Sequence, residues 1–347
     1  MDKQNLFGLS REKINEIVVS LELPSFTASQ ITDWLYKKHV GSIEEMTNLS
    51  KKTRQLLDEK YTVGLIAPTK VQTSSDGTKK YLYPTVTEKF IESAYIPDDE
   101  RATLCVSTQI GCKMGCLFCM TGKQGFQGNL TAAEIVNQIH SLPEFEQLTN
   151  VVYMGMGEPL DNVQAVLDSL EILTAPWGYA WSPKRITVST IGIIPAMITF
   201  LEKSQAHLAV SLHSPYDEER KRIMPVQNIY PITEVIAEIK KWDLGRQRRV
   251  SFEYIMFRGV NDTPRHVNEL VRLLRGIKCR INLIRFHPIP DTALEGTPYN
   301  EIVEFQNMLK ARGMMVTIRA SRGEDIYAAC GMLSTKELVK RQQEPDF

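Results

Sequence analysis

Four of the six cysteines lie within fifteen residues, and they are the part of this sequence with the clearest potential for chemistry. Cys112, Cys116 and Cys119 form a C-x3-C-x2-C loop that also contains glycines, and Cys105 precedes it. Three thiolates are one ligand short of a closed zinc site, and they suit an iron–sulfur cluster with one iron left open for a ligand. The alternatives are a zinc site with a distant fourth ligand, or thiols that bind no metal.

The loop lies between a predicted strand and a predicted helix. Leu104–Ser107 is a short β-rich run, and Thr131 with Glu134 has the spacing of a capping box that starts a helix. In parallel α/β folds, functional residues gather where strands end and the chain turns into the next helix. The cysteine loop is therefore in a typical position for a cofactor site.

Other polar residues also follow predicted strands. In the stretch MGMGEPL, Gly157 lets a ligand approach the backbone, and Glu158 can accept hydrogen bonds from an ammonium group. Ser189 ends the next β-rich run, and Ser211-Leu212-His213 ends the one after it. One such strand end is uninformative, but three on successive units indicate groups around a polar cofactor.

The second half of the chain has the rhythm of alternating strands and helices. From about residue 100 onward, β-rich runs begin 23 to 47 residues apart, which leaves room for a helix and two loops between strands. This spacing predicts βα units around a parallel sheet or barrel. The runs are Leu104–Ser107, Val151–Met154, Arg185–Thr190, Leu208–His213, Val250–Met256, Ile281–Phe286 and Val316–Arg319.

The first hundred residues have different patterns. Residues 1 to about 60 show helical periodicity, and Thr27 with Gln30 resembles a capping box at the start of a second helix. Residues 61–97 contain strand-like pieces, Tyr81–Tyr83 and Phe90–Tyr95, separated by turn signals. We interpret them as a small β segment that bridges two domains.

The overall charge identifies no partner, because 41 Lys and Arg balance 41 Asp and Glu. A neutral total can still hide a basic face. Each local basic group is most simply a solvated surface; these groups are Lys37-Lys38, Lys51-Lys52-Arg54, Lys79-Lys80, Arg220-Lys221-Arg222 and Arg246 with Arg248-Arg249. Without a signal-type N-terminus or an apolar run of about 18 residues, the sequence predicts a cytoplasmic protein with reduced cysteines and no membrane segment.

The cysteine loop resembles the signature of the radical S-adenosylmethionine superfamily, and the whole chain resembles the RlmN/Cfr family of RNA methyltransferases within it. This resemblance rests on LCVSTQIGC, TGKQGF, MGMGEPL, VSTIG, SLHSP, FEYIMFRGVND, INLIRFHPIP and RGEDIYAACG. It implies an α/β fold with an incomplete (β/α)6 radical-SAM barrel at 98–335, a helical RNA-binding domain at 1–60, the small β linker at 61–97 and a tail at 336–347.

The resemblance also implies roles for individual residues and a pair of cofactors. A 4Fe–4S cluster is held by Cys112, Cys116 and Cys119, while Cys330 carries a methyl group and Cys105 resolves the intermediate. Glu92 matches the family's proposed base. The implied S-adenosylmethionine contacts are Gly157, Glu158, Ser189, Ser211, Leu212, His213 and His287, the last standing where the family usually has Asn.

Three further interpretations of single residues belong with these. Taken alone, Cys330 among small residues is more simply a buried thiol than a nucleophile. Gly128 stands where the family often has Arg, so one cationic contact is missing. Cys279 matches no family role, and we interpret it as structural.

The implied activity is methylation of C2 of an adenosine in 23S rRNA, in the peptidyl-transferase region, and of an adenosine in tRNAs. A first S-adenosylmethionine methylates Cys330, a second yields a radical that activates this methyl group, Glu92 removes the C2 proton, and Cys105 attacks Cys330 to release the RNA. The resemblance also implies a monomer that takes electrons from a donor such as flavodoxin with its reductase.

Two alternatives remain at this point. One is methylation of C8 of the same rRNA adenosine, the antibiotic-resistance branch of the family, which shares the cysteines. The other is a zinc-stabilised RNA-binding protein without catalysis.

Overall fold

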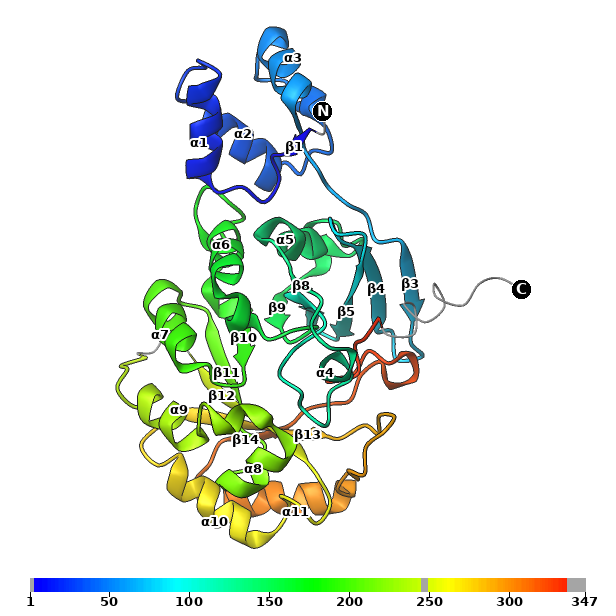
Figure 1. The fold of residues 1–347 in the computed structure, drawn as a ribbon, viewed down its shortest axis with the longest axis vertical. Helices are drawn as coiled ribbons and strands as arrows, with labels where there is room; N and C mark the ends of the chain where they lie inside the picture. Colours follow the sequence, from blue (N-terminus) through cyan, green and yellow to red (C-terminus); the bar gives the residue numbers. More distant parts are fainter. Residues whose placement is uncertain (1–2, 245–248, 336–347) are drawn as a thin grey trace, which may run out of the picture.

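A ten-stranded sheet forms the centre of the computed structural model, which describes residues 3–244 and 249–335 (Figure 1). The strand order is β14-β13-β12-β11-β10-β9-β6-β5-β4-β3. The tail at 336–347, Arg246 and Arg248 lie outside the described residues.

The sheet's parallel part coincides with the seven β-rich runs predicted above. Its strands are β6 (Arg101–Cys105), β9 (Asn150–Tyr153), β10 (Ile186–Thr190), β11 (His207–Ser211), β12 (Val250–Met256), β13 (Cys279–Arg285) and β14 (Val316–Ile318). The intervening helices are α5 (Ala132–His140), α6 (Val163–Thr174), α7 (Ile194–Lys203), α8 (Asp217–Ile223), α9 (Ile232–Ile239), α10 (Pro264–Leu273) and α11 (Tyr299–Lys310). Six described βα units and a last strand make an open partial barrel, which confirms the predicted fold class.

Residues 70–98 extend the same sheet instead of forming a separate unit. The strands β3 (Lys70–Thr73), β4 (Lys79–Pro84) and β5 (Phe90–Asp98) pair antiparallel with one another, and β5 pairs antiparallel with β6. The strand-like pieces predicted here are therefore strands, and they lengthen the wall of the barrel on the side of the cysteine loop.

The N-terminal residues pack around an apolar core of their own. They comprise β1 (Gln4–Asn5), α1 (Arg11–Ser20), α2 (Thr27–Tyr36), α3 (Lys51–Lys60) and β2 (Tyr61–Thr62), and Figure 1 shows them stacked on one end of the barrel. Val136 of α5 and Ile172 of α6 complete this second core. At the junction Gly8 has a φ of +85°, and a side chain there would approach Cα of Ala133 to 2.3 Å.

The cysteine loop is bounded by short elements. These are β7 (Gln109–Ile110), which pairs antiparallel with β8 (Gly128–Asn129), and the single-turn helix α4 (Met120–Gln124). The described 3-10 helices are η1 (Ile43–Glu45), η2 (Phe145–Gln147), η3 (Pro159–Asn162), η4 (Pro183–Arg185), η5 (Pro225–Asn228) and η6 (Glu324–Ile326). None of the helices within 3–244 and 249–335 has the length and apolarity that a bilayer crossing requires.

Of the two capping boxes predicted from sequence, one is confirmed and one is wrong. The Thr131 hydroxyl caps α5 by accepting a hydrogen bond from the backbone N–H of Glu134. The Glu134 carboxylate in turn accepts a hydrogen bond from the backbone N–H of Thr131. The second helix begins one residue earlier than expected, because Thr27 is its first helical residue, buried in the N-terminal core, and Phe26 is the cap. No side chain caps that helix.

We therefore expect Thr131→Val to lower the free energy of unfolding by about 1 kcal/mol through loss of the cap. The matched variant Thr27→Val, which removes a hydroxyl that caps nothing, should change it by less than about 0.5 kcal/mol. Chemical denaturation followed by circular dichroism measures both. Equal losses in the two variants would contradict the assignment of these helix starts.

Candidate active site

A cavity of about 360 Å³ opens at the carboxyl ends of the parallel strands. Inward-facing residues of successive strands line it, because side chains alternate along each strand and register aligns them across the sheet. Among these lining residues are Thr103, Cys105, Val152, Met154, Ser189, Ser211, Glu253, Ile284 and Arg319. The loop cysteines, Cys112, Cys116 and Cys119, and the distant Cys330 line the same space. Five of the six cysteines thus meet in one cavity.

The three loop thiols lie close enough to oppose one another's ionisation. Burial, together with neighbouring loop thiols, raises the pKa of Cys112 to about 12 and that of Cys116 well above its usual value. No described group of three or more His, Cys, Asp or Glu side chains is arranged to hold a metal ion. The donor set still fits a multi-iron cluster, because each thiolate then binds a different iron and the cationic irons favour the thiolate forms.

Backbone contacts hold the cysteine loop in place. Gly111 has a φ of +73°, and a Cβ there would lie 1.7 Å from the carbonyl oxygen of Gly125. The backbone N–H of Leu117 donates to the carbonyl of Ile223 at 3.0 Å, which ties the loop to α8. Only glycine permits this close return of the chain, so the loop's glycines shape it.

The strand end after β9 presents a buried carboxylate to the cavity. Gly157 has a φ of +97°, and Gln109 accepts the backbone N–H of Glu158 at 2.9 Å. The two carboxylate oxygens of Glu158 accept the N–H groups of Leu160 and Ile191, each at 3.0 Å. Burial raises the pKa of Glu158 to about 7, although these hydrogen bonds lower it. A cationic ligand would favour its charged form.

His213 presents a defined hydrogen-bond donor to the cavity. The backbone N–H of Ile255 donates to its Nδ1 at 3.0 Å, so the neutral ring carries its hydrogen on Nε2. Burial lowers the pKa of His213 to about 3, which keeps the ring neutral. The ring also packs edge-on against Phe118 of the cysteine loop, with centroids 4.8 Å apart.

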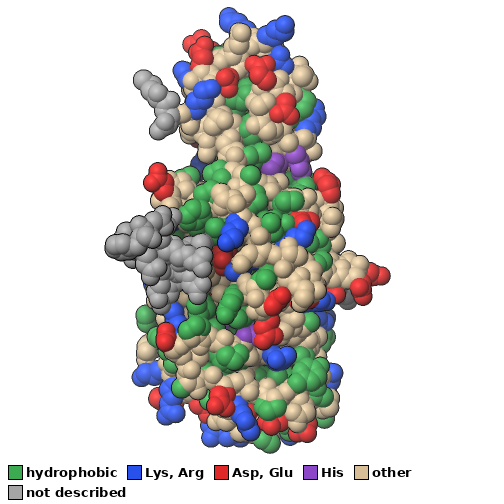
Figure 2. All heavy atoms as spheres, turned by 90° about the vertical axis from the view of Figure 1, so that its right-hand side faces the viewer, with side chains coloured by type: hydrophobic (Ala, Val, Ile, Leu, Met, Phe, Trp, Pro, Cys, Tyr) green, Lys and Arg blue, Asp and Glu red, His purple; other side chains and the backbone are tan. Residues whose placement is uncertain are grey.

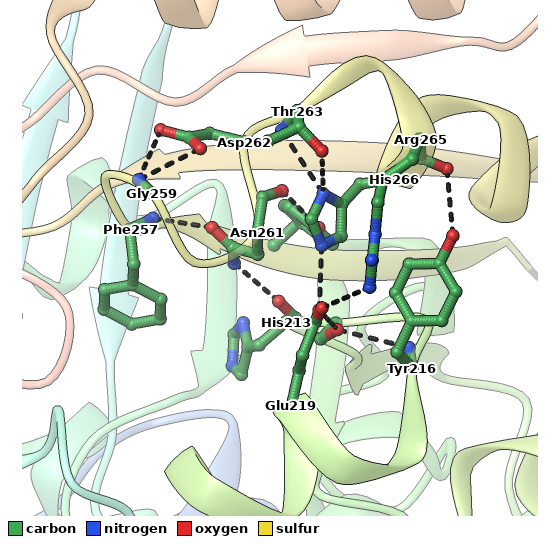
Figure 3. Close-up of polar contacts among 12 residues, drawn as sticks. His213, Tyr216, Glu219, Phe257, Gly259, Asn261, Asp262, Thr263, Arg265 and His266 are labelled. Carbon is green, nitrogen blue, oxygen red and sulfur yellow. Dashed lines mark hydrogen bonds and ion pairs between the residues drawn. The ribbon is translucent and has the colours of Figure 1, made fainter.

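A polar network behind the cavity fixes the backbone of His213, whose φ of +56° is unusual for a side-chain-bearing residue (Figure 3). The amide nitrogen of Asn261 donates to the carbonyl oxygens of His213 and Ile255 at 2.6 and 2.7 Å. Nearby, Glu219 accepts from Arg265 and pairs with His266, which keeps α8 and α10 together.

Arg220 ties the strand ends to one another, although the sequence grouped it with Lys221 and Arg222 as a surface basic run. It is fully buried. Its guanidinium donates to the backbone carbonyl of Ile191 after β10 and to those of Ser211 and Leu212 at the end of β11. It also donates to the side-chain oxygen of Gln227 and, at the limit of distance, to the carbonyl of Tyr230. The surface interpretation of Arg220 is therefore wrong, because these carbonyls need internal donors.

Not every predicted contact residue lines the cavity. Gly157, Glu158, Ser189, Ser211 and His213 do, whereas Leu212 is buried behind them and is absent from the lining. His287 lines it too, with Nδ1 only 3.1 Å from Oε1 of Glu324. The structure therefore places most of the predicted set around one space.

Glu92 lies next to the cavity wall but outside its lining. It is on the same face of β5 as Ala94, which pairs directly with Cys105. Its buried carboxylate bonds Lys80 Nζ and the backbone N–H of Ser334, both at 3.0 Å. Because Lys80 is only 9% exposed and is paired with Glu92, it does not contribute to a basic surface.

The C-terminal segment brings Cys330 to the cavity. Thr121 donates to the carbonyl of Leu333 at 2.6 Å, and Asp325 accepts from Ser74 at 2.5 Å. The Cys330 side chain is exposed at this point. Cys279 is instead half-buried against the main core on β13, as a structural residue would be.

Sequence reasoning missed several residues that build the site. It did not single out Gln109, Asn261 or the pair Glu253 and Arg319, and it grouped Arg220 with surface cations. A charged residue inside an otherwise apolar run, as in VSFEYIM, was an available signal for Glu253, whose entire strand is buried.

Comparisons with known proteins agree with this geometry. The profile of the Radical SAM superfamily matches residues 106–274, and that of the "Ribosomal RNA large subunit methyltransferase N-terminal domain" matches residues 4–63. The solved structure of a radical SAM methyltransferase from Sphaerobacter thermophilus superposes with a TM-score of 0.88 at 38% identity, over 95% of this chain and 99% of that one.

Two relatives cover almost the full length. A "Probable dual-specificity RNA methyltransferase RlmN" of Bacteroides thetaiotaomicron is 57% identical over 96% of this chain and 97% of its own. The "Dual-specificity RNA methyltransferase RlmN" of Alcanivorax borkumensis is 40% identical over 98% of this chain and 93% of its own.

The partial barrel and its cysteine loop thus define a radical S-adenosylmethionine enzyme, a class that implies a 4Fe–4S cluster and S-adenosylmethionine. Within this class, the chain belongs to the RlmN family of RNA methyltransferases.

We expect Arg220→Met to lower the free energy of unfolding by at least about 3 kcal/mol and to weaken S-adenosylmethionine binding. The substitution leaves buried carbonyls at the ends of β10 and β11 without donors. The matched control is Lys221→Met, one residue on and exposed. Chemical denaturation and calorimetric titration measure the two effects, and equal behaviour of both variants would contradict a clamping role for Arg220.

Proposed function

We propose that this enzyme methylates C2 of an adenosine in 23S rRNA, in the peptidyl-transferase region, and of an adenosine in tRNAs. The observation that carries the proposal is the meeting of Cys105 and Cys330 beside the three loop cysteines in one cavity. A radical enzyme that used only the cluster would need no further thiols there. Two extra cysteines suit a protein-bound methyl carrier and its resolving partner.

The cofactors fit the two sides of the cavity. Cys112, Cys116 and Cys119 would hold the cluster, and Glu158, Ser189, Ser211 and His213 would contact S-adenosylmethionine, with Gly157 and His287 beside them. Leu212 would support these contacts from behind through its backbone. When bound, the cluster and S-adenosylmethionine supply a methyl group and a 5′-deoxyadenosyl radical; the reducing electron would come from a donor such as flavodoxin with its reductase.

The remaining steps belong to the protein's own side chains. Cys330 would carry the methyl group, for which its exposed position in the cavity is suitable. Glu92 would remove the C2 proton. Its carboxylate bonds Ser334, so the C-terminal segment would have to shift before the carboxylate reaches a substrate. Cys105 would attack Cys330 and release methylated RNA.

RNA would approach across the N-terminal helices and the open side of the barrel. Figure 2 shows lysine and arginine side chains at the far end of the N-terminal helices, interspersed with acidic ones, and mixed charges elsewhere on this face. Lys51 and Lys52 at the start of α3 are exposed and are suitable for phosphate contacts. The target adenine would leave its stack to enter the cavity. We propose that the enzyme acts in the cytoplasm as a monomer.

The decisive experiment compares cysteine variants of anaerobically prepared protein containing about four irons per chain. Cys105→Ala should trap a covalent protein–RNA adduct, because nothing then attacks Cys330, whereas Cys330→Ala should form none. Gel mobility and mass spectrometry of the adduct are the measurements.

Normal turnover by Cys105→Ala, or a colourless protein with stoichiometric zinc, would contradict the mechanism. Cys279→Ala is the matched control and should turn over normally. Mass spectrometry of the product nucleoside separates C2 from C8, and a methyl group on C8 would overturn the proposed regiochemistry.

We also expect S-adenosylmethionine to bind more weakly as the pH falls through about 7. An ammonium group needs the charged form of Glu158, whose raised pKa means that the neutral form dominates below about pH 7 in the ligand-free protein. The affinity should fall up to about ten-fold per pH unit between about pH 7 and 5.5. Calorimetric titration measures it, and Glu158→Gln should bind weakly with little slope; an unchanged slope would exclude Glu158 as its origin.

A further inference from the structure

The cavity contains a guanidinium that the proposed steps do not use. Arg319 directly follows β14 and lines the cavity together with Cys105 and Cys330. Its Nη1 lies 3.4 Å from Oε2 of Glu253 and 3.3 Å from Sδ of Met154. The arginine side chain is 35% exposed and the glutamate only 5%, so the carboxylate lies behind the guanidinium, away from solvent.

A chain of hydrogen bonds across three neighbouring strands fixes this pair. Oε1 of Glu253 accepts from Asn282 of β13 at 2.8 Å and from Ser251 at 3.1 Å. Asn282 in turn accepts from Thr317 of β14 at 2.6 Å. The backbone N–H of Arg319 donates to the carbonyl of Leu283 at 2.8 Å. The arginine is therefore held in place before any ligand arrives.

Cys105 lines the same cavity as this guanidinium, and Met154, whose Sδ lies 3.3 Å from Arg319 Nη1, links the two. Cys105 packs with Ala94 and Ala328 in a small apolar cluster that Met154 borders. Burial, together with the nearby Cys330, raises the pKa of Cys105 to about 12, although Arg319 and a backbone hydrogen bond with Met154 lower it.

Several charged groups on the elements around Cys105 have partners among the described residues, and Arg101 of β6 donates to Asn150 at 3.3 Å. On β5 and β4, Glu92 is bound to Lys80, and in the C-terminal segment Arg322 lies 3.2 Å from Asp98. Arg319 is also near Cys330. Burial, Glu253 and Cys119 raise the pKa of that thiol, and Arg319 lowers it. Arg319 is thus placed to act on both thiols, and of the two only Cys330 is affected by the loop residue Cys119.

We propose that Arg319 is a positioning residue that stabilises the thiolate of Cys105 during its attack on Cys330. This inference rests on the proposed function. In the step, a sulfur–sulfur bond forms between Cys105 and Cys330, and the bond from Cys330 sulfur to the RNA-bound methylene carbon breaks. The electron pair stays on that carbon, which takes a proton from solvent to complete the methyl group. Both sulfurs are oxidised, and the carbon is reduced.

The test separates adduct formation from adduct resolution in single-turnover reactions with RNA. Arg319→Met should form the adduct but resolve it about ten-fold more slowly at neutral pH, so that the adduct accumulates. Losing a nearby cation shifts a pKa by about two units, and the greater nucleophilicity of the more basic thiolate offsets part of the lost thiolate fraction. Raising the pH should restore the resolution rate in this variant, but not in Cys105→Ala.

Two further variants serve as controls. Arg319→Lys keeps a cation and should recover most of the resolution rate. Arg285→Met removes an exposed arginine at the end of the neighbouring strand, outside the cavity lining, and should resolve the adduct at the wild-type rate.

A second measurement needs no turnover. The pH dependence of iodoacetamide alkylation, located by peptide mass spectrometry in the cluster-loaded protein, should show a higher apparent pKa for Cys105 in Arg319→Met. If Cys105→Ala forms no adduct, the proposed function fails. If Cys105→Ala traps an adduct but Arg319→Met resolves it at the wild-type rate, or if the alkylation profile is unchanged, the inference about Arg319 alone is overturned.

Discussion

One buried guanidinium holds the strand ends on which this active site depends. Parallel strands end with unpaired carbonyls that point into the protein, and each must find a donor there. Arg220 supplies donors after β10, at the end of β11 and at the turn before α9. Because these strand ends carry Ser189, Ser211 and His213, satisfying the backbone also sets the positions of side chains that line the cavity. Asn261 repeats the arrangement for His213 and the end of β12.

The antiparallel extension has a comparable role on the opposite side of the cavity. The turn between β3 and β4 binds the C-terminal segment, since Asp76 accepts the backbone N–H of Gly323 and Ser74 donates to Asp325. Ser334 then bonds Glu92 on β5. These contacts bring Cys330 back across the sheet to Cys105, which is 225 positions earlier in the chain. A barrel without β3–β5 would lack this anchor.

Electrostatics inside the cavity are arranged in pairs. Beside the cavity Glu92 is paired with Lys80, and in its lining Arg319 is backed by Glu253, while Glu158 is held by the Thr190 hydroxyl and two backbone N–H groups and has no cationic partner among the described residues. The unpaired carboxylate is the one suited to an external cation, and the half-exposed guanidinium is the one suited to thiolates. The neutral total of 41 against 41 charges gave no indication of the site.

The sequence by itself determined the cysteine loop, the seven parallel strands and most of the strand-end residues that line the cavity, because local spacing and strand-end position define them. It also indicated the capping box at Thr131. It could not show that Thr27 is buried, that Arg220 and Lys80 are not surface cations, or that Arg319 and Cys105 line one cavity. Those facts depend on which distant carbonyl, carboxylate or thiol lies beside a side chain, and only the tertiary structure brings such groups together.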